Sequence, residues 1–242
     1  MKPLLSLCFH GCCAFFHFYA INWLSSLGLN IIEMAEFFTV WTTFFHLIMN
    51  LVLAFHDVLD LLLRNDGDER HQNSKRDNIN PKVVEGFLSR EIFFGLLLHL
   101  AIIMSSFTQF VFWLIYSIDR EMILPEATDF PVFLNHMLHT FPLPLAVLAL
   151  VVFSTNFPNS KKESQCRAVS GVGIKLVCFV GFAYLVTTLV IFELKGIWPY
   201  PFMFSFTRMD FFVFSLFVFL FAIVLCYTWA SLEFKIKNLK VA

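Results

Sequence analysis

Five polar side chains recur along one face of an otherwise apolar segment. Thr39, Thr43, His46, Asn50 and Asp57 are offset by 0, 4, 7, 11 and 18 positions. At about 100° per residue they lie within roughly 40° of one line along an α-helix. Phe, Leu, Val and Ala occupy the opposite face. This pattern indicates either hydrogen bonding between helices or ionisable groups that take part in chemistry.

A second polar group occurs in the run LNHMLHT, which contains Asn135, His136, His139 and Thr140. The two histidines are three residues apart, so they share one face of a helix. A neutral imidazole, with an ordinary pKa of about 6.5, can remove a proton from a hydroxyl group and so activate it as a nucleophile. Histidine side chains are also zinc ligands. The residue types therefore permit a hydroxyl–imidazole pair, a metal site, or simple packing.

The composition places these polar groups in a membrane protein. Of the 242 residues, 58% are hydrophobic, only 14% are charged, and 33 are Phe. Soluble domains carry about 25% charged residues. The 17 basic and 18 acidic residues nearly balance, which gives no electrostatic sign of nucleic-acid binding. Lipid is therefore the expected partner of most of the surface.

Six apolar segments are long enough to cross about 30 Å of hydrocarbon at about 1.5 Å per residue. We predict an all-α, polytopic membrane protein that forms one domain over residues 1–242, with a polar cytoplasmic loop at 64–85. The predicted spans are residues 4–27, 37–63, 91–116, 131–155, 171–192 and 211–232.

Basic residues predict the orientation of these spans. One side would hold fourteen Lys and Arg residues, and the other would hold only Arg120, Lys195 and Arg208. Basic residues are enriched on the cytoplasmic side, so we expect both termini to be cytoplasmic. Thr39 would then lie about one turn, and His139 about two turns, inside the opposite membrane surface. The loops at 118–125 and 197–202, IDREMILP and IWPYPF, are expected to cover them.

Three sequence blocks resemble a known family. They are FWLIYSIDREMILP at 112–125, VFLNHMLHT at 132–140 and GIWPYPF at 196–202. Their order and spacing are similar to those of the androgen-induced and androgen-dependent TFPI-regulating proteins. The resemblance implies a six-span membrane threonine hydrolase that cleaves fatty acid esters of hydroxy fatty acids, without a cofactor.

The same resemblance implies the site residues. The histidine partner corresponds to His139, the second His of the N-H-x-x-H-T run. Thr39, Thr42 and Thr43 all compete as the nucleophile. Thr39 matches the family pattern, because an aromatic pair precedes it and Asp57 follows five helical turns later.

Several points stay open at this level. We expect a supporting polar cavity around the pair, formed by Thr43, His46, Asn50, Asn135 and His136, and the last three are candidates for oxyanion donors. A zinc-dependent intramembrane hydrolase, or a non-catalytic transporter, receptor or scaffold, are the alternative functions. The resemblance implies the endoplasmic reticulum or plasma membrane as the location. Protein partners and oligomeric state are not predicted.

Overall fold

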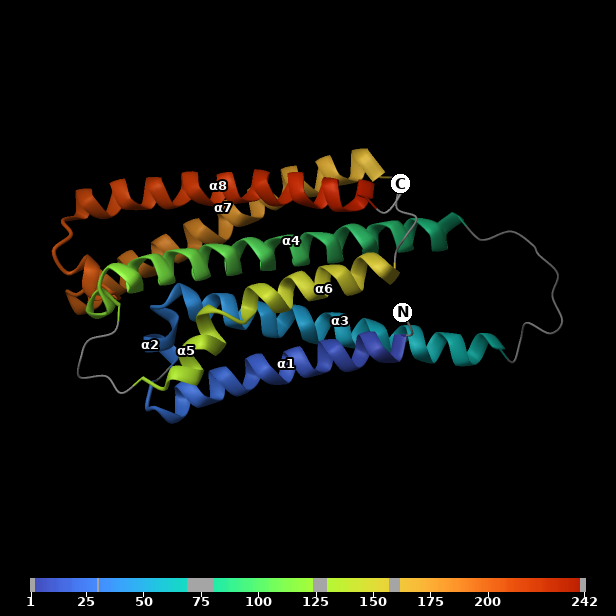
Figure 1. Cartoon of the computed structure of the whole chain (residues 1–242), viewed down its shortest axis with the longest axis horizontal. Coiled ribbons are helices and arrows are strands. Elements are labelled where there is room, and N and C mark those ends of the chain that lie inside the picture. Colours follow the sequence, from blue (N-terminus) through green and yellow to red (C-terminus); the bar gives the residue numbers. More distant parts are fainter. Residues whose placement is uncertain (1–2, 30, 69–80, 124–129, 157–161, 240–242) are drawn as a thin grey trace.

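Long helices run along the whole molecule (Figure 1). The computed structural model describes residues 3–29, 31–68, 81–123, 130–156 and 162–239. These residues form helices and no strand, which confirms the predicted all-α class. In chain order the elements are α1 (Pro3–Ser26), α2 (Ile31–Ala35), α3 (Phe38–Asp68), α4 (Pro81–Ile118), η1 (Arg120–Met122), α5 (Val132–His139), α6 (Pro142–Asn156), α7 (Lys162–Lys195), η2 (Pro201–Met203) and α8 (Arg208–Leu239).

Apolar helices indicate an integral membrane protein. Five helices contain stretches long and apolar enough to span a bilayer, and the bent pair of α5 and α6 can form a sixth span. Large apolar side chains face outward, including Phe15 and Phe217, each 69% exposed. In water such exposure is costly, whereas lipid tails solvate it. Figure 1 shows that α1 begins and α8 ends at the same end of the bundle.

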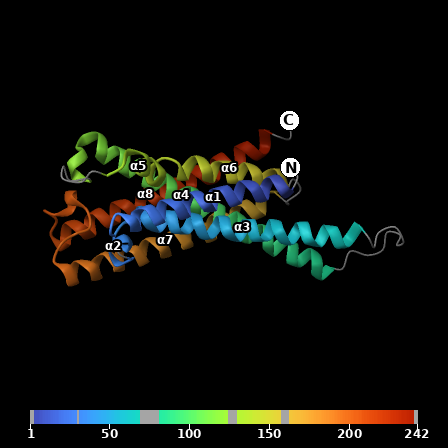
Figure 2. The ribbon, with the colours of Figure 1, turned by 90° about the horizontal axis from the view of Figure 1, so that it is seen from below.

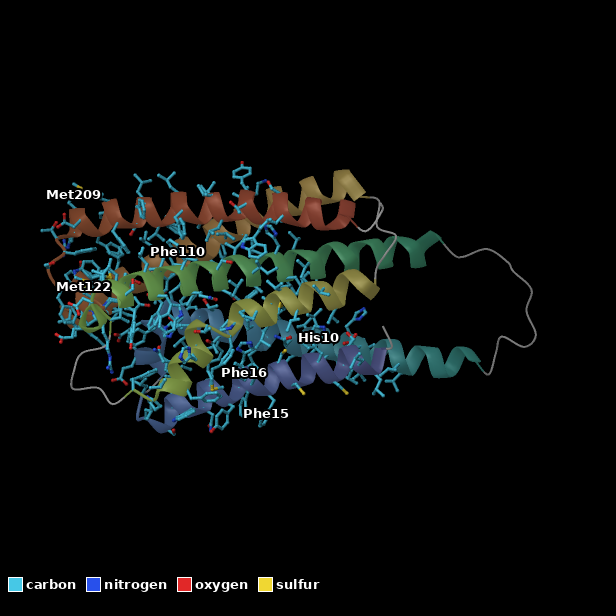
Figure 3. All side chains as sticks on the ribbon, viewed as in Figure 1. His10, Phe15, Phe16, Phe110, Met122 and Met209 are labelled. Atoms are coloured by element: carbon cyan, nitrogen blue, oxygen red, sulfur yellow. The ribbon has the colours of Figure 1, made fainter. Side chains whose placement is uncertain are left out.

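Helix α4 is the centre of the bundle, because it packs against α3, α6, α7 and α8. Helices α1 and α3 lie side by side along most of their lengths, as the two views show (Figures 1 and 2). The short helices η1 and η2 contact each other at the end opposite to the start of α1. We call this the η end. Figure 3 shows Met122 and Met209 there, while His10 lies farther along the bundle.

The fourth predicted span is not one continuous helix. Helix α5 ends at His139, α6 begins at Pro142, and the two are bent by 44°. Pro142 has no backbone N–H and cannot continue the helix, but it suits the first position of a new one. The amide of Phe141 bonds to the carbonyl of His136, which also accepts from the amide of Thr140. The break therefore places His139 at a helix end.

Two further differences concern the connections between helices. The predicted loop at 64–85 is too long, because α3 continues to Asp68 and α4 already begins at Pro81. Charged residues can extend a helix beyond the hydrocarbon, where water solvates them, and proline is favoured at a first helical position. Residues 69–80 of the loop and 124–125 of the IDREMILP block lie outside the described residues. The short helix α2 was not predicted from the sequence.

Candidate active site

The structure brings Thr39 and His139 together. Thr39 lies in the first turn of α3 and His139 is the last residue of α5. Thr39 Oγ1 is 3.2 Å from His139 Nε2, across a separation of 100 residues in the chain. Both residues are only 8% exposed. This distance is within the range for a hydrogen bond between a nucleophile and its base.

The other ring nitrogen of His139 decides the direction of that hydrogen bond. His139 Nδ1 lies 3.0 Å from the carbonyl oxygen of Asn135. Because a carbonyl oxygen only accepts, Nδ1 carries the proton. In a neutral imidazole Nε2 then has a free lone pair, and the Thr39 hydroxyl donates to it. The helix backbone of α5 thus holds the tautomer that a general base requires.

Phe112 fixes the plane of the imidazole. The rings of Phe112 and His139 are stacked with their centroids 3.4 Å apart and their planes at 15°. Phe112 belongs to α4 and is 6% exposed. Such packing limits rotation of the imidazole about its side-chain bonds, so Nε2 stays directed at α3. Phe112 was not among the site residues predicted from the sequence.

Tyr200 reaches the same position from the η end. Gly196, at φ +73°, ends α7 and lets the chain turn back into the IWPYPF segment. The hydroxyl of Tyr200 accepts a hydrogen bond from the amide of Phe38 at 3.2 Å. The side chains of Thr39 and Tyr184 lie near this hydroxyl. Burial raises the pKa of the Tyr200 hydroxyl, so it keeps its proton at neutral pH.

Tyr184 and an ion pair hold this end of the bundle together. The Tyr184 hydroxyl donates to the carbonyl oxygen of Glu36 at 2.7 Å. The side chains of Glu36 and Lys195 form an ion pair. Both contacts join α7 to the turn that precedes α3. They hold α7 against the start of α3.

An apolar cavity adjoins Thr39. It has a volume of about 150 Å³ and lies between α3, α4, α7 and α8, with η2 at one end. Thr39, Tyr184 and Tyr200 contribute to its wall, which is otherwise lined mainly by aromatic and aliphatic side chains. From the level of Tyr184 it extends inward along α7 to Val177, a rise of about 10 Å. An apolar chain fits such a space better than a polar ligand does.

Not all of the predicted supporting residues surround the pair. Thr43 donates to the carbonyl oxygen of Thr39 at 2.9 Å, and the Asn135 carbonyl binds His139. The Asn135 side-chain oxygen is buried, and the described chain gives it no hydrogen-bond partner. His136 instead stacks on Trp113, with ring centroids 5.4 Å apart, and its Nδ1 lies 3.0 Å from the Thr140 hydroxyl. His136 therefore faces α4 rather than Thr39.

His46 and Asn50 belong to a separate group deeper in the bundle. We call this the central histidine cluster; it consists of His10, His17, His46, Asn50 and Ser105. His46 Nε2 is 2.6 Å from Ser105 Oγ, and His10 Nδ1 is 3.1 Å from Asn50 Oδ1. The rings of His17 and His46 have centroids 4.9 Å apart. These residues are buried, and none of them lines the cavity beside Thr39.

The two α1 members of this cluster could have been found from the sequence. His10 and His17 are seven residues apart, which places them on one face of a helix. His46 and Asn50 lie about 10 Å and 16 Å from Thr39 along α3. At that distance Asn50 cannot serve as an oxyanion donor beside Thr39. Along the part of the chain that the structure describes, no three His, Cys, Asp or Glu side chains converge as metal ligands would.

The fold and the site together define a helical membrane protein in which a threonine–histidine pair adjoins an apolar cavity. The chain belongs to the family described as FAR-17a/AIG1-like protein, whose model matches residues 12–233. This result confirms the resemblance inferred from the three sequence blocks. No solved structure matches the chain.

Curated relatives are similar at modest identity. The androgen-dependent TFPI-regulating protein of Mus musculus is 27% identical over 200 residues, which are 77% of this chain and 76% of that protein. The protein of the same name from Rattus norvegicus is 31% identical over 104 residues, 42% and 41% of the two chains. The androgen-induced gene 1 protein of Homo sapiens is 26% identical over 149 residues, 61% and 54% of the two chains.

Proposed function

We propose that this protein is an intramembrane hydrolase that cleaves fatty acid esters of hydroxy fatty acids, with Thr39 as nucleophile and His139 as general base. The observation that carries the proposal is the 3.2 Å contact between Thr39 Oγ1 and His139 Nε2, with Nδ1 held by a backbone carbonyl. A threonine hydroxyl is a weak nucleophile until an adjacent base takes its proton. His139 is the base within reach, and it acts without a metal or cofactor.

The first half of the reaction transfers the acyl group to Thr39. The Oγ1 atom forms a bond to the ester carbonyl carbon, and its proton moves to His139 Nε2. The carbonyl π electrons move to oxygen and give a tetrahedral oxyanion. When this intermediate collapses, the bond to the alkoxy oxygen breaks and His139 returns the proton to that oxygen. The products of this half are the free alcohol and an acyl-threonine.

Water completes the cycle. His139 Nε2 removes a proton from a water molecule as its oxygen attacks the acyl-threonine carbonyl. Collapse of the second tetrahedral intermediate releases the fatty acid, and the proton on His139 returns to Thr39 Oγ1. Threonine and histidine are thus regenerated in their starting states.

The surroundings of the pair support a lipid as the substrate. The cavity next to Thr39 is almost entirely apolar, and the outer face of the bundle is suited to lipid tails. An ester with long chains can therefore reach Thr39 without first leaving the hydrocarbon. We assign the activity to the endoplasmic reticulum or plasma membrane, with both termini cytoplasmic and Thr39 near the opposite surface.

A covalent probe tests the proposal directly. A fluorophosphonate reacts with activated hydroxyl groups, so purified protein in detergent should be labelled and should hydrolyse a fatty acid ester of a hydroxy fatty acid. Thr39→Ala should abolish labelling and lower kcat/KM at least about 10³-fold, since the nucleophile is lost. Thr187→Ala is the matched control, because the Thr187 hydroxyl bonds to the Ala183 carbonyl of its own helix and does not line the cavity.

The same measurements can reject the assignment. Equal expression and an unchanged melting temperature would show that Thr39→Ala is folded. Hydrolysis by that folded variant at the wild-type rate would exclude Thr39 as the nucleophile. Wild-type protein that neither reacts with the probe nor hydrolyses the ester would instead favour a transporter, receptor or scaffold.

A further inference from the structure

The position of the cavity relative to the two reacting side chains distinguishes the two halves of an ester. Thr39 lines the cavity, whereas His139 does not. Phe112 lines it too, and its ring is stacked on the imidazole at 3.4 Å. The aromatic ring thus separates His139 from the cavity. If an ester atom binds at His139 Nε2, the chain attached to that atom must lie on the α5 side of Phe112.

The chemistry assigns one ester atom to each side chain. The carbonyl carbon must meet Thr39 Oγ1, and the alkoxy oxygen must meet His139 Nε2 to receive a proton when it leaves. The acyl chain extends from the carbonyl carbon, and the alcohol chain extends from the alkoxy oxygen. Given the proposed hydrolase function, on which this step rests, the acyl chain is the one next to the cavity.

The Tyr200 hydroxyl is placed to meet the carbonyl oxygen of an ester bound at Thr39. The side chain of Tyr200 lies near that of Thr39, and both residues line the cavity. The Phe38 amide donates to this hydroxyl, and the Tyr184 hydroxyl adjoins it. A phenol that keeps its proton can donate to an oxyanion. None of the three donors considered from the sequence lines the cavity.

We infer that the cavity between α3, α4, α7 and α8 binds the acyl half of the ester, that Tyr200 donates to its carbonyl oxygen, and that the alcohol half lies on the α5 side of Phe112. The inner part of the cavity, about 10 Å deep from the level of Tyr184 to Val177, accepts roughly eight carbons of an extended chain. The enzyme therefore selects the length of the acyl chain more strictly than that of the alcohol.

Two isomeric esters separate the halves experimentally. Butyl octanoate has a long acyl chain and a short alcohol, and octyl butanoate has the reverse. Val218 lines the cavity on α8, one α-helical turn before Ala222 at its inner end. Val218→Phe should lower kcat/KM for butyl octanoate about tenfold or more, because the larger ring occupies the path of the long chain. It should leave octyl butanoate at the wild-type rate.

Val224→Phe is the matched control, because it makes the same substitution on the same helix at a side chain that is 58% exposed and does not line the cavity. Both isomers should be hydrolysed normally by this variant. If Val218→Phe fails to fold, Val180→Phe on α7 replaces it, with the 42% exposed Val186→Phe as its control. A loss confined to octyl butanoate, or an equal loss for both isomers in a folded, probe-labelled variant, would overturn the assignment of the halves.

Tyr200→Phe tests the donor. The phenyl ring retains the packing against Phe37 and Phe202, so only the hydroxyl is removed. Loss of an oxyanion donor should lower kcat about 10²-fold for both isomers while KM stays the same. An unchanged kcat, or a rise in KM alone, would exclude Tyr200 as the donor. Wild-type protein that does not hydrolyse either isomer, or a folded Thr39→Ala variant that hydrolyses both at the wild-type rate, would reject the proposed function itself, which is a different result from altered isomer selectivity.

Discussion

Two buried polar groups on α3 differ in what surrounds them. Near the η end, Thr39 faces His139 and adjoins an apolar cavity. Two turns deeper, His46 belongs to the central histidine cluster, where it contacts Ser105 and packs against His17. No member of that cluster lines the cavity. Both groups contain histidine, but only the first has a space for a substrate beside a hydroxyl group.

The comparison shows that a polar stripe on a membrane helix can serve two purposes at once. In the central cluster the hydrogen bonds join α1, α3 and α4, which is a structural use of polar side chains in lipid. At the η end the α5–α6 break supplies a histidine whose Nε2 lone pair is free to accept a proton. We therefore expect substitutions of the pair near the η end to lower activity with little change in stability. Substitutions in the central histidine cluster should change stability with little change in activity.

The largest expected contrast is between His139→Ala and His46→Ala. Loss of the general base should lower kcat by about 10²–10⁴-fold with little change in melting temperature. Loss of the fully buried His46 ring should lower stability by about 2 kcal/mol while the folded protein keeps its specific activity. Ester hydrolysis and thermal unfolding in detergent measure both. Equal losses of activity in the two variants would show that the two groups act as one site.

A smaller effect is expected from Pro142→Ala, which alters the helix break. An alanine at this position has an N–H group that can bond to the carbonyl of Leu138 and continue α5. His139 Nε2 would then move away from Thr39, and a displacement of about 1 Å can cost roughly 10²-fold in rate. We expect kcat to fall by about tenfold or more, measured with the same ester. A rate equal to that of the wild type would show that the break is not needed to place His139.

The smallest effect concerns stability within the central cluster. The described part of the chain offers neither ring nitrogen of His17 a hydrogen-bond partner, although the residue is fully buried. His17→Leu should therefore leave stability unchanged or raise it by up to about 1 kcal/mol. Asn50→Leu should instead lower it by about 1 kcal/mol, because His10 loses its partner and the His46 carbonyl loses the bond from the Asn50 side chain. A large loss of stability in His17→Leu would indicate that its nitrogens bind something essential, and calorimetry would detect it.

Much of the fold could be predicted from the sequence, because a lipid environment restricts the structures that a chain can form. Apolar length predicts spanning helices when every backbone group must bond within its own helix, and the helices α1, α3, α4, α7 and α8 cover five of the predicted spans to within one residue at each end. The break after His139 was not foreseen, although Pro142 lies inside the fourth span and signals it. Helix α2 is only five residues long and has no such signal.

The candidate site was harder to predict from the sequence than the fold was. Thr39 and His139 were named because three sequence blocks resemble a family, whereas the polar stripe alone grouped Thr39 with Asn50 and Asp57. Periodicity assigns residues to a face of a helix but does not specify which neighbour that face contacts. For that reason His46 and Asn50 were expected near the pair, and they lie elsewhere.

The sequence by itself determined the membrane class, the spanning segments and the residue types available for chemistry, since these follow from local hydrophobicity and side-chain identity. The tertiary structure decided which of those residues meet. Contacts across 100 residues, such as Thr39 with His139, depend on how helices pack and where a helix breaks. The stacking of Phe112 on the imidazole and the approach of Tyr200 arise in the same way, because they exist only after separate helices have been brought together.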